Sequence, residues 1–547
     1  MATRTIGIDF GTTTTLIAEG SPGARPMVVP MGDATSWMPS VAARRDGQFL
    51  VGEDALRLSP DRLIRSVKRC ITNDQYTITT ADGEHGHDVD EVVLAVLTEL
   101  AARAKFENLP IEEPGIGRLG CPAMWDAKRR RRLLDLAQAA GFGVGASTLI
   151  DEPIAAGIMW INDEVRRGRF LDEARVLVFD MGGGTLDVAV LDVTAGPGRE
   201  PEVFVLASDG LDEAGDALDL AIAKDVEGHL GQHGVALADL PDEGLARAYL
   251  LRAATGAKVA LSEQRSTLVD VGYTTATLPI VTYTREELDD ALRPQMDRAW
   301  ALIESTLRAA YLTREGGAST IKLRALPTSE LTKRISHVLI TGGMSQVPGV
   351  ARYLGPRFPD ALLHQHLGVP PTETIVAGLA ETTAYERVNL HRPGFDFVLE
   401  WRNRDGSAQQ LTLYRAYTPF YEPWEAQSKD VLKYTWPDGA TAVEASRRFD
   451  LPRSGSAVLR VVAMDESRVA LRFGGHEADG LHIEFGHSGI RFALSPDGSV
   501  YVKDGLGTEQ RLRADRWPVL RAGVGRVALN FERAEWKPVD RRSWDTK

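Results

Sequence analysis

The fold of this chain is decided by residues Val178–Asp187, whose sequence is VFDMGGGTLD. An apolar run ends at an aspartate and breaks into a glycine-rich turn with a threonine, which is typical of a buried strand opening into a tight turn. A related stretch, IGIDFGTTT, occupies Ile6–Thr14, and a third turn, ITGGM, occupies Ile340–Met344. Glycine lets the backbone approach a phosphate closely, and threonine adds a hydrogen bond without repulsive charge. The first two stretches therefore predict paired phosphate-binding turns.

Asp9 and Asp180 each end a strand directly before one of these turns. Both carboxylates are therefore expected at the mouth between two lobes, where they can hold Mg²⁺ mainly through its water molecules. Aspartates also cap ordinary turns, but two acidic glycine turns in one chain favour a nucleotide site.

The chain has 547 residues, too many for one hydrophobic core, so two or more domains are expected. No run approaches the roughly 18 apolar residues that a membrane span needs, so no membrane partner is expected. The first strand is expected from Thr5 without a basic and apolar leader before it, and only two cysteines are present, Cys70 and Cys121. These features predict a cytoplasmic protein.

The formal net charge is −13, with 63 Lys and Arg against 76 Asp and Glu. Residues 395–547 hold 23 basic and 22 acidic side chains, so the acidic excess lies in the N-terminal part. This balance disfavours nucleic-acid binding, and no nucleic-acid partner is expected. The basic run Lys128–Arg132 is expected to be the solvated face of a helix.

Up to about residue 385, short apolar strands alternate with longer stretches of helical periodicity, which predicts an α/β fold with helices packed on mixed sheets. Residues 313–334 lack clear periodicity and are expected to form an inserted loop. The remaining expected helices and strands cover residues 90–105, 126–140, 244–262, 284–311 and 347–358, and residues 5–10, 16–19, 176–179, 188–193 and 338–341, respectively.

After residue 394 the texture changes to short alternating runs separated by turns, with Asp-Gly pairs suited to hairpins. No long amphipathic helix is visible there. Residues 395–547 are therefore expected to form an all-β C-terminal region, like a β-sandwich, or two small β modules of about residues 395–475 and 476–547.

Taken together, the three turns resemble the nucleotide site of the actin-like ATPases, and within that superfamily the detailed match is to the Hsp70 chaperones. The resemblance covers about residues 4–385 and implies a two-lobed actin-like (ribonuclease H-like) ATPase fold for residues 1–390. In the family, the proline at the position of Pro122 is tied to signalling between domains. Further matching motifs are SVKR at Ser66–Arg69, CPA at Cys121–Ala123, DEPIAAG at Asp151–Gly157 and GDALD at Gly215–Asp219.

The resemblance implies catalytic roles for Lys68, Glu152, Asp180 and Thr185. Lys68 would contact the γ-phosphate or the attacking water, while Glu152 and Asp180 would hold the water shell of Mg²⁺, completed by Asp9. ATP or ADP and Mg²⁺ are the implied cofactors, with K⁺ as a further candidate ion. The residues implied in nucleotide contacts are Gly11, Thr12, Thr13, Thr14, Gly182, Gly183, Gly184, Thr185, Lys258, Ser262, Gly342, Gly343, Met344 and Gln346.

The adenosine side departs from the family pattern. Val259 and Gln346 replace the two arginines that sandwich adenine in the family, and Thr255 replaces an acidic residue on the ribose side. A guanidinium stacked on a base contributes about 1 kcal/mol, so weaker nucleotide affinity than in typical members is expected. The linker, residues 389–395, has no leucine run, and Thr148 replaces a basic residue used in J-protein docking. Action of a J-protein or a nucleotide exchange factor is therefore left open.

These observations lead to the hypothesis of an Hsp70-like ATPase whose nucleotide state controls binding of a protein client or partner by residues 395–547. Three alternatives stay open: a nucleotide-sensing scaffold with little turnover, a small-molecule kinase, and a filament-forming protein of the same superfamily. A strict requirement for a sugar or acid acceptor would favour the kinase, and sedimentation with ATP would favour the filament.

Overall fold

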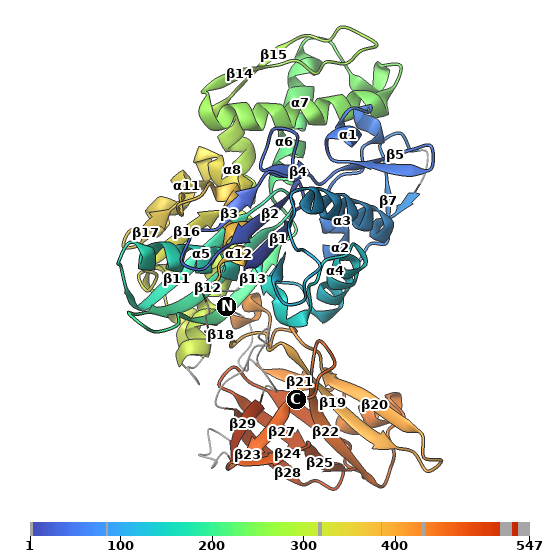
Figure 1. Ribbon diagram of the computed structural model, residues 1–547, viewed down its shortest axis with the longest axis vertical. Helices are drawn as coiled ribbons and strands as arrows, with labels where there is room; N and C mark the ends of the chain where they lie inside the picture. Colours follow the sequence, from blue (N-terminus) through green and yellow to red (C-terminus); the bar gives the residue numbers. More distant parts are fainter. Residues whose placement is uncertain are drawn as a thin grey trace.

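The computed structural model describes residues 4–83, 86–315, 320–383, 386–427, 433–514 and 528–533. Two α/β lobes stand side by side, and a strand-rich C-terminal region lies beneath both of them (Figure 1). We call the lobes first and second by their central sheets, which contain β1 (Thr5–Phe10) and β11 (Leu171–Met181), respectively.

The first lobe is built on a sheet of order β10-β9-β1-β2-β3, with β4 also paired to β2. Every residue of β1 is buried, as expected for a continuous apolar run in a central strand. Its antiparallel partner β2 places Leu16 opposite Asp9, and β9 runs parallel on the other side. The other strands of this sheet are β2 (Thr14–Gly20), β3 (Met27–Val29), β4 (Trp37–Pro39), β9 (Gly117–Cys121) and β10 (Leu149–Asp151).

The second lobe repeats this arrangement in the order β17-β16-β11-β12-β13-β18. An antiparallel hairpin, β11 with β12, again has a parallel strand beside it, here β16. The hairpin register places Asp187 opposite Asp180. The repeated order brings the carboxyl ends of both central strands to the interface between the lobes. The other strands are β12 (Leu186–Ala195), β13 (Glu202–Leu211), β16 (His337–Thr341), β17 (Leu362–His364) and β18 (Glu386–Asn389).

Helices cover both sheets and separate them (Figure 1). Helices α5 and α12 cross closely between the lobes, since a Cβ added at Gly378 of α12 would lie 1.9 Å from the Ala155 carbonyl oxygen of α5. The helices of the two lobes are α1 (Glu53–Leu56), α2 (Val67–Thr72), α3 (Val89–Phe106), α4 (Ala127–Ala139), α5 (Glu152–Arg166), α6 (Gly215–Gln232), α7 (Glu243–Glu263), α8 (Arg285–Glu315), α9 (Thr320–Ala325), α10 (Thr328–Thr332), α11 (Pro348–Leu354) and α12 (Thr374–Ala380).

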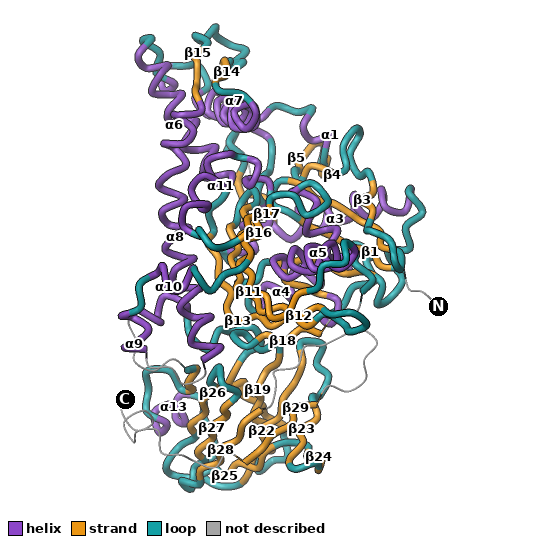
Figure 2. Tube along the Cα trace, turned by 90° about the vertical axis from the view of Figure 1, so that its left-hand side faces the viewer, coloured by secondary structure: helices purple, strands orange, loops and turns teal. Residues whose placement is uncertain are grey.

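The expectation of a loop over residues 313–334 is wrong. Helix α8 continues to Glu315, and α9 and α10 follow at its lower end (Figure 2). Leu323 and Leu331 are buried against the core of the second lobe. Helices of five or six residues are too short to show a periodic pattern, so packing rather than local sequence fixes them. Three small hairpins decorate the lobes: β5 (Ala42–Arg45) with β6 (Gln48–Val51), β7 (Thr77–Thr79) with β8 (Gly86–Asp88), and β14 (Ser266–Val269) with β15 (Val281–Thr284).

The C-terminal region contains two sheets, of order β20-β19-β22-β25 and β21-β26-β27-β28-β29-β23-β24. The rings of Phe397 and Phe492, one from each sheet, lie 5.1 Å apart in a shared core. Alternating burial along β22 is typical of a sheet with one face on such a core. One short helix, α13 (Ala442–Arg448), interrupts the expected all-β pattern. The strands are β19 (Phe395–Arg402), β20 (Ala408–Tyr414), β21 (Tyr434–Trp436), β22 (Ser456–Ala463), β23 (Ala470–Phe473), β24 (His476–Ala478), β25 (Leu481–Glu484), β26 (Arg491–Leu494), β27 (Ser499–Lys503), β28 (Glu509–Ala514) and β29 (Ala528–Arg533).

Both sheets mix strands from either side of residue 475. Strand β25 joins the sheet of β19, whereas β21 and β23 join the sheet of β26 to β29. A division into modules of residues 395–475 and 476–547 therefore does not follow the sheets.

The junction between the lobes and the C-terminal region is held by hydrogen bonds. Strand β18 pairs in parallel with β13, and the Asn389 side chain then accepts the N–H groups of His391 and Arg392 at 3.0 and 2.8 Å. Beyond residues 386–392, the Ala127 N–H donates to the Ala416 carbonyl, and this hydrogen bond connects α4 of the first lobe to the C-terminal region. The Tyr421 hydroxyl donates to the Ala309 carbonyl of α8 in the second lobe at 3.1 Å. The C-terminal region therefore contacts both lobes.

None of the helices in the described ranges combines the length and the apolar character needed to cross a bilayer.

Candidate active site

Two glycine hairpins face each other where the lobes meet. In the first, the Gly11 N–H donates to the Thr14 carbonyl at 3.0 Å, and in the second, the Gly182 N–H donates to the Thr185 carbonyl at 3.0 Å. The turns are thus closed by the same bond at equivalent positions.

The hairpins also touch across the cleft. A Cβ added at Gly183 would lie 1.9 Å from the Thr13 hydroxyl oxygen, and one at Gly184 would lie 2.6 Å from the Thr12 methyl carbon. No side chain fits at either glycine while the hairpins keep this approach. The backbone of the second hairpin therefore faces the threonines of the first with no side chain between them.

A buried ion pair lies behind the hairpins. The Lys68 ammonium donates to Glu152 Oε1 at 2.6 Å, and both side chains are almost fully buried. Lys68 lies on α2, whereas Glu152 is the first residue of α5. Burial alone would lower the pKa of Lys68, but the carboxylates of Glu152 and Asp9 outweigh it and raise this pKa above its usual value. Lys68 is therefore held in its charged form.

Three aspartates surround this pair, and each has a raised pKa. Burial raises the pKa of Asp9 to about 7, with a further contribution from Glu152 and an opposing one from Lys68. Burial and Glu152 likewise raise the pKa of Asp187 to about 7. The pKa of Asp180 is raised by burial and by Glu152, although the Thr341 hydroxyl donates to this carboxylate at 3.0 Å.

The site is therefore short of positive charge, because one lysine faces four buried carboxylates. A divalent cation would relieve this imbalance, so the donor set fits Mg²⁺. Within the described residues, no three histidine, cysteine or acidic side chains converge closely enough to ligate one ion directly. The four carboxylates are those of Asp9, Glu152, Asp180 and Asp187.

The third glycine turn closes the second lobe beside Asp180. Gly342 has a φ of 80°, and a Cβ there would lie 2.7 Å from Asp180 Oδ1. The turn continues with Met344, whose side chain is buried in the core of the second lobe rather than open to the cleft. Gly343 and Gln346 are exposed.

On the adenosine side, Lys258 of α7 reaches the start of α6. Its ammonium lies 2.8 Å from Asp219 Oδ1 and donates to the Gly215 carbonyl at 3.2 Å. The Gly215 N–H in turn donates to the Gly182 carbonyl of the second hairpin. Ser262 donates to the Lys258 carbonyl within α7, and Val259 is 64% exposed. Lys258 is thus linked to the second glycine hairpin through Gly215, while Val259 presents an apolar surface to solvent.

The lobes are also bridged in front of Lys68. Ser66 donates to Asp216, and the Arg69 guanidinium donates to Asp212 at 2.8 Å. Asn73 donates to the second oxygen of Asp212 at 2.6 Å. These contacts join α2 of the first lobe to the second lobe beside the ion pair.

Two residues of the site have no predicted role in the sequence. Asp187 could have been found from hairpin register, because closing the turn at Gly182 and Thr185 places it opposite Asp180. The expectation that Lys128–Arg132 forms a solvated helix face is wrong for Arg130. Its side chain is 1% exposed, and its Nη1 lies 2.5 Å from Asp151 Oδ1. No local signal distinguishes Arg130 from its basic neighbours.

Comparison with known proteins agrees with this geometry. A family model described as Hsp70 protein matches residues 5–384, more than half of the chain. The chain belongs to the Hsp70 family. The actin-like fold expected for its N-terminal part and the strand-rich C-terminal region are confirmed.

Individual relatives are also similar to this chain. The chaperone protein DnaK of Thermosipho melanesiensis is 30% identical over 400 residues, covering 72% of this chain and 61% of the relative. DnaK of Thermoplasma volcanium is 30% identical over 394 residues, covering 69% and 57%. DnaK of Halobacterium salinarum is 28% identical over 354 residues, covering 63% and 51%. The matched region thus spans about three fifths or less of the length of these curated relatives.

Proposed function

We propose that this Hsp70 protein binds ATP, hydrolyses it slowly with Mg²⁺, and uses its nucleotide state to control binding of a protein partner by the C-terminal region. The observation that carries the proposal is the buried Lys68–Glu152 pair behind two facing glycine hairpins. We place the nucleotide-binding domain at residues 1–390 and the partner-binding domain at residues 395–547.

Phosphoryl transfer needs positioning and charge stabilisation more than covalent chemistry. The N–H groups of Gly11 to Thr14 and Gly182 to Thr185 would bind the phosphates, and Lys68 would donate to the γ-phosphate or the attacking water. Bound Mg²⁺ would supply positive charge that balances the buried carboxylates. Asp9, Glu152 and Asp180 would hold its water molecules, since these side chains do not converge on one point. Asp180, which accepts a hydrogen bond from the Thr341 hydroxyl, would also orient the attacking water.

A chain of contacts supports control of the C-terminal region by the nucleotide. Asp151, adjacent in sequence to Glu152, pairs with the buried Arg130. The same guanidinium lies 3.9 Å from the ring centroid of Tyr417, in the C-terminal region. It also donates to the carbonyls of Pro122 and Ala123, the segment tied to interdomain signalling in the family resemblance. A movement of Glu152 on nucleotide binding would therefore shift Asp151 and Arg130 and change the contact of Arg130 with Tyr417.

The test is Mg-ATP binding and turnover by the full chain, with Asp180→Asn as the site variant and Asp360→Asn, an exposed aspartate, as its control. Slow, saturable hydrolysis that is lost only in Asp180→Asn would support the ATPase. Hydrogen exchange in residues 395–514, compared between ATP and ADP, measures the coupling. Identical exchange in both states would contradict nucleotide control.

A nucleotide-sensing scaffold is the second candidate, and exposed Val259 and Gln346 in place of the family's arginines favour it. Saturable ATP binding with no detectable phosphate release would select it over the ATPase.

A further inference from the structure

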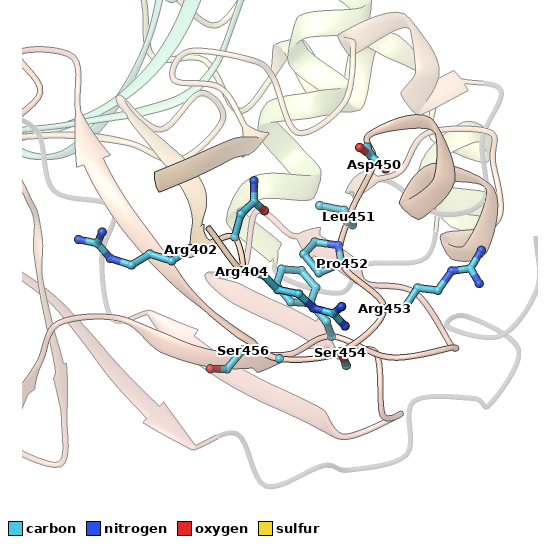
Figure 3. A pocket seen from close by; sticks show the side chains of 11 residues that line it. Arg402, Arg404, Asp450, Leu451, Pro452, Arg453, Ser454 and Ser456 are labelled. Carbon is cyan, nitrogen blue, oxygen red and sulfur yellow. The ribbon is translucent and has the colours of Figure 1, made fainter. Parts of the chain in front are cut away.

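The C-terminal region holds a pocket of about 430 Å³ on the side chains of three separate segments (Figure 3). The end of β19 and the turn after it contribute Arg402 to Arg404, and the loop after α13 together with the first residue of β22 contributes residues 450 to 456. Phe485, directly after β25, completes the lining. This pocket has no part in the nucleotide site.

The pocket has a strong excess of positive charge. Arg402, Arg404 and Arg453 line it and are exposed, against a single lining carboxylate, that of Asp450. In the described part of the chain, none of these three guanidinium groups is paired with a carboxylate, and that of Arg402 donates one hydrogen bond, to the Gly406 carbonyl at 3.1 Å. They are therefore available to an acidic ligand from outside.

The acid nearest in sequence is already engaged. Asp405 accepts the Ser407 N–H at 2.9 Å and the Ser407 hydroxyl at 2.6 Å. These hydrogen bonds lower the pKa of Asp405 below its usual value, although the group is exposed. This carboxylate stabilises its own turn and forms no ion pair with Arg402 or Arg404, which precede it in the chain.

Phe485 and Trp401 hold the backbone segments that carry the arginines. Phe485 is buried, its ring lies 5.7 Å from that of Trp401, and its N–H donates to the Gly455 carbonyl at 2.8 Å. The Trp401 indole N–H donates to the Asn403 side chain at 3.2 Å, which fixes the opposite wall. These contacts connect the three segments that line the pocket, and its recognition chemistry is that of the guanidinium groups.

The arrangement of the charges favours an extended ligand. Figure 3 shows Arg404 lying across the pocket toward Ser454, while Arg402 and Arg453 extend to opposite sides. Guanidinium groups that converge suit one compact anion, whereas groups spread along a groove suit several acidic groups on one chain. A polypeptide fits better than a nucleic acid, because the Phe485 ring is buried and offers no stacking face for a base.

We propose that this pocket binds an acidic stretch of a polypeptide partner, with carboxylates of the partner on Arg402, Arg404 and Arg453. The proposal rests on the proposed function, in which the C-terminal region binds a protein, and it supplies the partner's chemistry. Spread surface charges of this kind speed association and make binding sensitive to salt.

The test is fluorescence anisotropy of the full chain with a labelled peptide of alternating glutamate and glycine, without nucleotide and with ATP or ADP. Arg404→Glu combined with Arg453→Glu is expected to weaken binding by about tenfold or more, since repulsion replaces attraction. Arg472→Glu, an exposed arginine on β23 outside the pocket, is expected to change binding less than about twofold. A lysine-glycine peptide of equal length should not bind, and melting temperatures verify that all variants fold.

Equal loss in Arg472→Glu, or no binding of the acidic peptide, would overturn the proposal. So would a labelled single-stranded oligonucleotide that binds more tightly than the peptide and is lost in the same double variant. Peptide binding at the pocket that is indifferent to ATP and ADP would uphold the site but contradict nucleotide control. If the protein hydrolyses ATP and responds to nucleotide but the double variant binds the peptide as wild type does, the pocket proposal is contradicted and the proposed function is upheld.

Discussion

The proposed phosphate side and the proposed adenosine side of the cleft differ in how closely they follow the Hsp70 pattern. On the phosphate side, Lys68, Glu152 and Asp180 are almost fully buried, and facing glycines admit no substitute. On the adenosine side, Val259 and Gln346 are exposed where the family resemblance places stacking arginines. Buried charges at the reacting end act together, so losing one disables the rest. Contacts with the base add affinity in separable amounts and can be lost one at a time.

The largest effect is expected from Lys68→Ala. Removing the ammonium takes away the proposed donor to the transferring phosphate and leaves Glu152 buried without its cation. Mg-ATP turnover in single-turnover assays should fall by about 100-fold or more. Lys333→Ala, which removes an exposed lysine paired with Glu330, is the matched control and should keep full activity. Unchanged turnover in Lys68→Ala would contradict the view that substitutions on the phosphate side are more damaging than those on the adenosine side.

The next largest effect concerns the ion pair behind Glu152. Arg130→Met leaves Asp151 as an unpaired buried carboxylate and should cost about 3 kcal/mol of stability, measured by urea unfolding. Arg129→Met changes the neighbouring arginine, which is partly exposed and paired with Asp74, and should cost about 1 kcal/mol or less. Equal losses in the two variants would mean that burial of Arg130 contributes nothing special.

The phosphate side also predicts a dependence of stability on pH. The pKa of Asp187 is raised to about 7 in the folded protein, against about 3.9 in an unfolded chain. The folded state therefore keeps a proton that the unfolded state releases, and the stability due to this group is lost as pH rises from about 4 to about 7. The stability of wild type relative to Asp187→Asn should fall across that window and stay level above it.

Urea unfolding of both proteins at several pH values in that window measures this difference. Added Mg²⁺ should reduce the slope, because a nearby cation favours the ionised carboxylate. A difference that rises with pH would contradict the raised pKa.

The smallest effect is expected on the adenosine side. Val259→Arg with Gln346→Arg should tighten ATP binding by about fivefold, as a guanidinium stacked on a base contributes about 1 kcal/mol. Turnover at saturating ATP should stay the same, since neither residue touches the phosphate hairpins. Val443→Arg, at an exposed valine in the C-terminal region, is the control. Isothermal titration with ATP measures the change, and tight binding by the unmodified protein would refute the expectation of a weakened base site.

Local sequence was sufficient for the hairpins and the long helices. Apolar runs ending in Asp-x-Gly predicted β1 and β11, and periodicity predicted α3, α4, α7 and α8 within a few residues of their observed bounds. These features depend on near neighbours in the chain, where strand alternation, helical spacing and glycine turns are set by short-range sterics. The short helices α9 and α10 were missed because packing on α8 stabilises them.

The sequence by itself determined the family, the two glycine hairpins and the change to β structure after residue 394. Only the tertiary structure decided that Arg130 is buried while Arg129 is partly exposed, and that β25 joins the sheet of β19. It also decided that Asp187 joins Lys68 and Glu152, which come from distant segments. The physical reason is that periodicity fixes which residues share a face, whereas burial and pKa depend on which distant segments pack there.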